Sequence, residues 1–283
     1  MRYPVKIFFE MTDNTRRIIT LLKKYGPLSK KDLADMGEMG WATVTKIINQ
    51  LETDTIVGRL GTETIDNGKR GKRAYLYDLS DETPLAIGVD VEYKTTTIIL
   101  TNLKGAIIAS ESIPTVVPTS LDMAKSFFFE TIFNFIQHNP DGEKAIGIGM
   151  GIPGIGFPLF DKLDNLKRSV LLEKWLSEKF NKPVIIQDNT KAYAIFEQWS
   201  NSNIPQDNFI FLSIRSGVGS GIFHNGGLYI GTRGLAGEIG HIQVKEHGDQ
   251  CRCGKTGCLE TIAGEQNLYH RYLSQILGKD LSS

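Results

Sequence analysis

The sequence predicts an α/β protein that begins with a winged helix-turn-helix. Residues 14–51 carry apolar side chains at helical spacing in three short runs, and a hairpin rich in glycine and basic residues follows them. Between residues 85 and 199, strand-like apolar segments come first and then alternate with helical ones, which is typical of a sheet joined by crossover helices. A chain of 283 residues is long enough for two or three compact units.

Three helices are expected in the N-terminal part. A helix over 14–25 ends at Gly26-Pro27, and Ser29, with Asp32 three residues later, begins the second helix in the manner of a capping box. The third helix begins near Trp41, whose indole we expect to be partly buried. Its apolar stripe has the spacing i, i+3, i+4, i+7 and consists of Val44, Ile47, Ile48 and Leu51.

A basic hairpin follows, with strands expected at 56–61 and 74–79 and four cations in the turn at 67–73. Three helices before such a hairpin predict a winged helix-turn-helix that binds double-stranded DNA, with the third helix in the major groove. The cations of the wing would contact phosphates. The candidate DNA-binding residues are Trp41, Thr43, Thr45, Lys46, Asn49 and Gln50 in the third helix, and Lys69, Arg70, Lys72 and Arg73 in the wing.

The distribution of charge bears on this interpretation, for which the alternative is a solvated helix face and a solvated turn. Residues 1–80 hold 14 Lys and Arg against 10 Asp and Glu, a net charge of +4. The other 18 basic and 22 acidic residues give 81–283 a net charge of −4. A basic head on an acidic body favours a polyanionic partner for the head.

The remaining sequence is expected to form two lobes. In the first lobe, strands are expected at 85–92, 95–101, 107–113, 145–152 and 184–188, and helices at 121–137, 170–180 and 190–199. The second lobe begins near Asn208, with strands at 209–214 and 221–224 and a helix at 265–277. Four aromatic residues are interpreted as helix core rather than as a ligand cage: Phe127, Phe128, Phe129 and Phe133.

All three cysteines of the chain lie near one histidine. His241, Cys251, Cys253 and Cys258 follow the spacing H-x9-C-x-C-x4-C within 18 residues. Soft and borderline ligands with tetrahedral potential indicate Zn²⁺, and four protein ligands make a closed, structural site. The alternative is three unrelated thiols. Cysteines used for metal rather than for disulfides are typical of a reducing cytoplasm, and no apolar run is long enough to span a membrane.

Several segments of the second lobe resemble the signature of the ROK family, which comprises repressors, uncharacterised open reading frames and sugar kinases. The resemblance is carried by 216–222 (SGVGSGI), 225–227 (NGG), 234–241 (GLAGEIGH) and the cysteine loop. The segment 151–154 (GIPG) is similar to the family's sugar-side loop, and the basic head resembles that of its repressor branch. The resemblance implies an actin/hexokinase-like (ribonuclease H-like) body whose two lobes enclose a sugar cleft.

The resemblance also implies roles for five residues of that cleft. Glu238, His241 and Glu260 match positions that bind sugar hydroxyls, Gly154 belongs to the sugar-side loop, and Asp188 matches the general base. Carboxylates accept strong hydrogen bonds from hydroxyls. His241 would direct one ring nitrogen to zinc and the other to the sugar, so the metal would hold the shape of the sugar site. For the two glutamates, the alternative is a surface carboxylate or a charge at the start of a helix.

Departures from the family pattern lie on the nucleotide side. Kinases of the family carry an Asp-x-Gly-Gly-Thr-like turn whose backbone N–H groups reach the phosphates. Here Glu92 and Tyr93 replace the glycines, so a carboxylate would repel phosphate and a ring would block the backbone. Arg215 and Ser216 depart from the small polar residues of the second glycine loop. We therefore expect no kinase activity, with Asp188 a vestigial base.

The chain stops at Ser283, whereas members of the family continue through further strands and helices. We expect the second lobe to be truncated, with apolar surface left for a partner subunit or for local disorder.

These expectations combine into a cytoplasmic, sugar-responsive transcriptional regulator of the repressor type. Residues 1–80 would bind a palindromic operator as a homodimer or higher homo-oligomer. Lobes over 84–200 and 207–283 would bind a monosaccharide effector that changes lobe closure. One alternative is an ATP-dependent sugar kinase of the same family, and another is a truncated DNA binder that no longer senses sugar.

Overall fold

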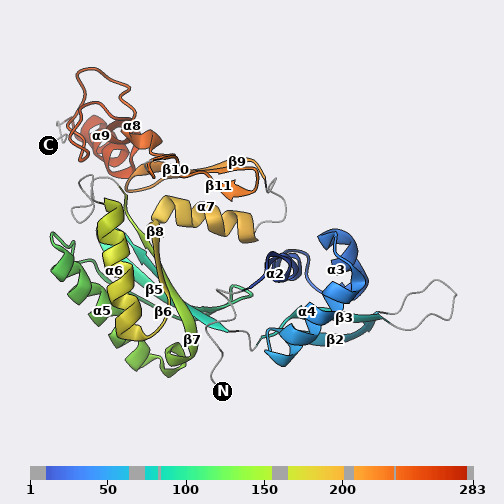
Figure 1. Ribbon diagram of the computed structural model, residues 1–283. Coiled ribbons are helices and arrows are strands. Elements are labelled where there is room, and N and C mark those ends of the chain that lie inside the picture. The colour runs from blue at the N-terminus through green and yellow to red at the C-terminus, as the bar shows by residue number, and fades with distance from the viewer. Residues whose placement is uncertain are drawn as a thin grey trace.

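The computed structural model describes residues 11–63, 74–81, 84–154, 165–200, 207–232 and 234–278, which form three sheets with their helices (Figure 1). The four wing residues predicted to bind DNA, Lys69, Arg70, Lys72 and Arg73, lie outside these ranges. Among the described helices, none is long and apolar enough to cross a membrane.

The N-terminal part consists of three helices packed on a small sheet. The helices are α2 (Asp13–Tyr25), α3 (Lys30–Gly37) and α4 (Trp41–Thr53). The antiparallel sheet has the order β1-β3-β2, formed by β1 (Leu28–Ser29), β2 (Val57–Glu63) and β3 (Ala74–Leu79). The predicted capping box is confirmed, because the Ser29 hydroxyl accepts from the Asp32 N–H and the Asp32 carboxylate accepts from the Ser29 N–H. The strand β1 was not predicted, since two residues are too few for an alternation to be seen.

The buried face of α4 is the predicted one, except at the start of the helix. Val44, Ile48 and Leu51 are fully buried, and Ile47 is partly buried at the edge of the same cluster. The prediction for Trp41 is wrong, because its side chain is 59% exposed. Trp41 lies in the first turn of α4, one turn before the buried stripe begins at Val44. The other buried members of this cluster are Ile18, Ile19, Leu22, Leu33, Ile56, Val57, Tyr77 and Leu79.

A five-stranded sheet of order β6-β5-β4-β7-β8 forms the next layer. Its first three strands, β4 (Leu85–Val91), β5 (Thr95–Asn102) and β6 (Ile107–Pro114), are an antiparallel meander. The strands β7 (Ala145–Ile152) and β8 (Val184–Asp188) are parallel to β4. In Figure 1, α5 (Leu121–His138) and α6 (Asn165–Phe180) lie side by side on one face, and α7 (Asn189–Ser200) lies between this sheet and the third one.

The aromatic cluster of α5 contributes to the core as predicted, with one exception. Phe128 is fully buried, and Phe127 and Phe129 pack against the same cluster. Phe133 is 44% exposed and stacks on Phe129 with a centroid distance of 5.7 Å, so it lies at the rim rather than in the core.

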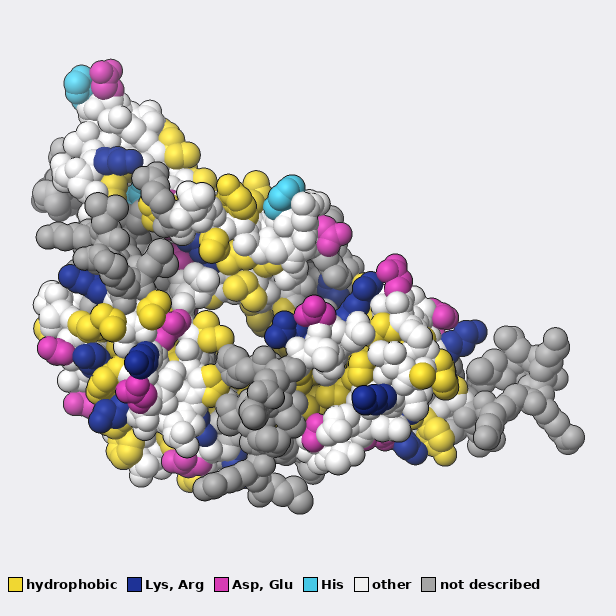
Figure 2. Space-filling view, viewed as in Figure 1, with side chains coloured by type: hydrophobic (Ala, Val, Ile, Leu, Met, Phe, Trp, Pro, Cys, Tyr) yellow, Lys and Arg dark blue, Asp and Glu magenta, His cyan; other side chains and the backbone are white. Residues whose placement is uncertain are grey.

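The third sheet is smaller and has the order β11-β10-β9. It consists of β9 (Phe209–Ile214), β10 (Val218–His224) and β11 (Gly227–Leu228), all antiparallel. One face packs on α7. On β9, Ile210, Leu212 and Ile214 are 68%, 54% and 52% exposed, and Figure 2 shows hydrophobic side chains along this part of the surface. The helices that follow are η3 (Ile239–His241), α8 (Leu259–Ala263) and α9 (Glu265–Leu277), and a further 3₁₀ helix, η1 (Pro140–Lys144), precedes β7.

The N-terminal part contacts the five-stranded sheet and α7. Lys23 of α2 donates to the carbonyl of Lys104 in the β5–β6 turn, and its Nζ lies 5.0 Å from the centroid of the Trp199 ring in α7. Burial lowers the pKa of Lys23. Lys104 itself lies 2.8 Å from the carboxylate of Asp81. The helix α7 therefore extends from the end of β8 to the N-terminal helices.

Candidate effector site and metal centre

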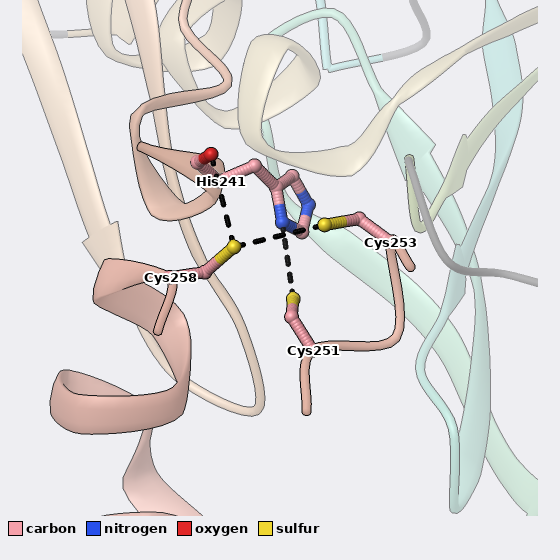
Figure 3. A group of neighbouring side chains, drawn as sticks. All are labelled: His241, Cys251, Cys253 and Cys258. Atoms are coloured by element: carbon pink, nitrogen blue, oxygen red, sulfur yellow. Dashed lines mark hydrogen bonds between the residues drawn. The ribbon is translucent and has the colours of Figure 1, made fainter. Parts of the chain in front are cut away.

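The predicted metal ligands lie together, with all four candidate ligand atoms within 4.8 Å of one another. Figure 3 shows the His241 ring and the three cysteine side chains pointing toward a common centre. The Nδ1 atom of His241 lies 3.5 Å from Cys251 Sγ, and the sulfurs of Cys253 and Cys258 lie 3.7 Å apart. Tetrahedral Zn²⁺ with ordinary bond lengths would require about 3.6 Å for a nitrogen–sulfur edge and about 3.8 Å for a sulfur–sulfur edge. The donor set and its spacing therefore fit zinc.

Burial of the cysteines also bears on the metal. Burial raises the pKa of the Cys251 thiol to about 12 and raises that of Cys258 as well. Neither thiol would ionise at neutral pH by itself, whereas a coordinated cation removes the proton of a thiol. The loop is shaped by glycines with positive φ, +90° at Gly254 and +67° at Gly257, and a Cβ at Gly257 would collide with the backbone of Lys245. The four residues can thus hold a structural metal ion.

The structure brings together all five residues predicted for the sugar cleft. Gly154, Asp188, Glu238, His241 and Glu260 line one cavity of about 60 Å³ between the second and third sheets. His241 belongs both to this cavity and to the cysteine cluster, so the metal centre and the cavity share one side chain.

Asp188 and Gly154 meet at the end of β8. The Oδ1 atom of Asp188 accepts from the Lys191 N–H at 3.2 Å and so caps the first turn of α7. Its other carboxylate oxygen lies so close to Gly154 that a Cβ there would collide with it. A side chain at residue 154 would therefore displace the carboxylate, which explains the glycine.

Glu238 is held by a lysine that the sequence analysis did not identify. Lys191 of α7 is almost completely buried, and its Nζ lies 3.2 Å from Glu238 Oε1 and 3.1 Å from the Gly234 carbonyl oxygen. Burial and the nearby Asp188 raise the pKa of Glu238, and Lys191 opposes that rise. The sequence offered one signal for this role: Lys191 lies three residues before Ala194 and so on the same face of α7, which is buried.

Glu260 is fixed through both oxygens. Its Oε2 accepts from the Val218 N–H at 3.0 Å, and its Oε1 accepts from Arg252 Nη2 at 3.2 Å. Arg252 stands between the metal-ligand candidates Cys251 and Cys253, and its guanidinium lies 4.1 Å from the centroid of the Tyr93 ring. Neither glutamate is a surface carboxylate, since Glu260 is buried and only 19% of the Glu238 side chain is exposed. Glu260 does have the position of a helix-start charge, because it lies in the first turn of α8.

The residues that depart from the kinase pattern occupy the opposite rim of the cavity. The turn after β4 carries Glu92, whose Oε1 lies 3.2 Å from Arg215 Nη2 and whose Oε2 accepts from Ser216 Oγ at 2.7 Å. Arg215 also donates to the hydroxyl of Tyr193 at 2.6 Å, and that hydroxyl donates to Asp90 at 2.7 Å. Burial raises the pKa of Asp90, and the hydrogen bond from Tyr193 opposes it.

The outer face of α4 carries most of the predicted DNA-binding side chains of that helix. Trp41, Thr43, Lys46, Asn49 and Gln50 are exposed, whereas Thr45 is half-buried. Lys30 of α3 reaches the same face, where its Nζ donates to Asn49 Oδ1 at 3.0 Å. The sequence analysis did not identify Lys30.

The five-stranded sheet has the order β6-β5-β4-β7-β8, so its first three strands form a meander and two parallel strands follow. The third sheet, β11-β10-β9, repeats the meander, and a carboxylate-lined cavity lies between the two sheets. This arrangement places the chain in the actin/hexokinase-like class. The chain belongs to the ROK family, whose model matches residues 86–282.

Relatives named as repressors and regulators match the chain including its N-terminal part. The xylose repressor of Bacillus spizizenii is 30% identical over 263 residues, which are 90% of this chain and 66% of that protein. The DNA-binding transcriptional dual regulator NagC of Escherichia coli is 29% identical over 269 residues, 92% of this chain and 64% of that protein. The chain thus spans slightly less than two thirds of the length of these relatives.

The solved structures that resemble the chain include both a regulator and a sugar kinase. A ROK family transcriptional regulator, a homologue of the E. coli MLC protein, superimposes with a TM-score of 0.71 at 25% identity, covering 94% of this chain and 67% of that one. A ROK family glucokinase from Streptomyces griseus has a TM-score of 0.57 at 22% identity and covers 69% of this chain and 61% of its own. The glucokinase match covers a smaller share of this chain than the regulator match does, 69% against 94%.

Proposed function

We propose that the chain is a sugar-responsive transcriptional regulator, acting as a repressor. Residues 1–80 would form a winged helix-turn-helix that binds operator DNA, and lobes over 84–200 and 207–283 would bind a monosaccharide effector. The observation that carries the proposal is that the matches to a repressor and to the ROK regulator cover 90% and 94% of this chain and so extend into the N-terminal helices, whereas the glucokinase match covers 69%. The same chain would bind a palindromic operator as a homodimer or higher homo-oligomer.

The surface of α4 supports a role in reading DNA. Its exposed Lys46, Asn49 and Gln50 have the chemistry that recognises guanine, adenine or phosphate in the major groove. Lys30 adds a second cation to this face through its bond with Asn49. The exposed Trp41 stands at the start of the same helix, where recognition helices contact base edges.

Replacing Lys46 and Asn49 together by alanine is expected to weaken specific DNA binding by at least about 30-fold, since each good base contact contributes about 1–3 kcal/mol. The measurement is the Kd for DNA upstream of the gene, titrated with salt. If Lys46 contacts a phosphate, its loss lowers the salt slope by about one. Lys174→Ala, on the exposed side of α6, is the matched control. Unchanged specific affinity in the double variant would rule out α4 as the reading helix.

The cavity supports a monosaccharide effector. Asp188, Glu238, Glu260 and His241 surround it with acceptors and a ring nitrogen, and a sugar is a ring of hydroxyl groups. Zn²⁺ bound by His241 and the three cysteines would supply the cross-link that holds His241 and the Arg252 loop beside the cavity. The helix α7 begins at this cavity and ends at Trp199 against Lys23, which gives the effector a physical connection to the DNA-binding part.

The second candidate is an ATP-dependent sugar kinase, which Asp188 at the cavity favours. The contact of Glu92 with Arg215 and Ser216 argues against a kinase. In a kinase, the backbone of the turn that carries Glu92 would have to approach the nucleotide phosphates. Binding of the purified chain to upstream DNA, with and without D-xylose, D-glucose and N-acetyl-D-glucosamine, tests the first candidate. Sugar-dependent ADP release that Asp188→Asn abolishes would establish the second instead. Specific DNA binding that no sugar changes would support the DNA binder that no longer senses sugar.

A further inference from the structure

The departures from the kinase pattern occur in two loops that are far apart in sequence and in contact in space. Glu92 and Tyr93 follow β4, whereas Arg215 and Ser216 follow β9. The ion pair of Glu92 with Arg215, at 3.2 Å, and its hydrogen bond from Ser216, at 2.7 Å, join the two turns directly. Glu92 therefore contacts both departures of the second loop.

Arg252 adds a second bridge and connects it to the effector residues. Its guanidinium lies 4.1 Å from the centroid of the Tyr93 ring, a distance at which a cation–π attraction is expected. The Nη2 atom of the same guanidinium donates to Glu260 Oε1 at 3.2 Å and to the Ser216 carbonyl oxygen at 3.4 Å. One side chain thus contacts the first-lobe turn, the β9–β10 turn and a carboxylate of the cavity.

With these bridges formed, both oxygens of Glu260 are engaged. Its Oε2 accepts from the Val218 N–H at 3.0 Å, and its Oε1 accepts from Arg252 Nη2 at 3.2 Å. A monosaccharide hydroxyl that bonds to Glu260 Oε1 competes with Arg252 and so favours separation of the two turns. The ion pair is weak enough to permit this, because half of the Arg215 side chain is exposed and exposed ion pairs contribute little.

We propose that Glu92, Tyr93, Arg215, Ser216 and Arg252 form an interlobe latch, in which side chains take the place of a nucleotide and hold the two lobes closed until an effector opens them. The proposal rests on the effector function proposed above and adds its regulation. The latch sets the closed state as the ground state, and the effector shifts the population by binding the open state more tightly. Breaking the latch removes the cost of opening and so tightens effector binding.

The test is a charge exchange across the latch. Glu92→Arg and Arg215→Glu each place like charges opposite one another, and the double variant restores an ion pair in the reverse sense. Hydrogen exchange is followed at the backbone N–H groups of Glu92 and Arg215, which donate within their own turns to Thr95 and Gly217. Each single variant is expected to exchange about tenfold faster there, and the double variant to return close to the parent rate. Glu178→Arg, on the exposed side of α6, is the control for an added positive charge.

Sugar binding is measured on the same variants by titration with D-xylose, D-glucose and N-acetyl-D-glucosamine. The single variants are expected to bind the effective sugar about tenfold more tightly than the parent, and the double variant to lose that gain. Exchange that is the same in the single variants and the parent would overturn the latch. Faster exchange in a protein that binds none of these sugars, the parent included, would overturn the effector function and with it the opening step.

Discussion

Replacing Cys258 with serine will release about one zinc ion per chain and remove the cooperative unfolding of the C-terminal part. Cys258 is fully buried at the start of α8, two residues before Glu260, so the ligand and the cavity carboxylate depend on the same turn. Structural zinc contributes apparent binding free energies on the order of 10 kcal/mol in small zinc-finger domains. A loss of that size rivals the about 5–15 kcal/mol that separates a folded from an unfolded domain.

Metal content by mass spectrometry and thermal unfolding by circular dichroism measure this result. Cys253→His puts a nitrogen ligand in place of the sulfur at the partly exposed position of the cluster and is expected to retain the metal. Thr256→Ala changes an exposed side chain of the same loop and should leave both measurements unaltered. A Cys258→Ser protein with parental stability and no metal in either form would refute the structural zinc.

Replacing Glu238 with glutamine will lower the affinity for the effector by roughly 10- to 150-fold, because hydrogen bonds to a charged group contribute about 1.5–3 kcal/mol. It will also destabilise the fold, since Lys191 Nζ loses the carboxylate that lies 3.2 Å away while its side chain stays only 5% exposed. Breaking a buried ion pair from one side costs about 3–5 kcal/mol. DNA affinity without sugar is expected to be unchanged, because Glu238 lies in the cavity and not in the N-terminal part.

A companion variant separates the two effects. Lys191→Met in the Glu238→Gln background removes the unpaired cation, so it should recover stability without recovering sugar binding. Glu246→Gln removes a charge from an exposed part of the following loop and serves as the control. Calorimetric titration and thermal unfolding of the four proteins give the comparison. Full sugar affinity in Glu238→Gln would remove this carboxylate from the effector site.

The parts of the fold that sequence could predict are those with a strong local signal. The strands β7, β8 and β9 and the helix α9 have the predicted bounds, because apolar alternation or helical spacing continues to their ends. The helix α6 begins at Asn165, five residues before the prediction, since Leu166 is the one apolar residue in 165–169 and gives no helical spacing. The two-residue strand β11 was missed for lack of length.

In the site, too, residues in local motifs were predicted and contacts between distant segments were not. The metal cluster was predicted from the spacing of its ligands, and the five cavity residues from the resemblance of short motifs to the ROK family. The partners of those residues were not predicted. Lys191 meets Glu238 from 47 residues away, and Ser216 meets Glu92 across 124 residues. No local pattern specifies a contact between distant segments, which depends on how the sheets pack.

The strand β9 has a consequence for handling the protein. Within the described residues it pairs only with β10, and no described strand pairs with its other edge. Its six residues, FIFLSI, include no charge and no proline, which are two of the features with which native edge strands prevent strand addition. Short uncharged segments of high β-propensity are also the ones that stack into cross-β assemblies. We therefore expect self-association, rather than unfolding, to limit the concentration at which the purified chain stays monodisperse.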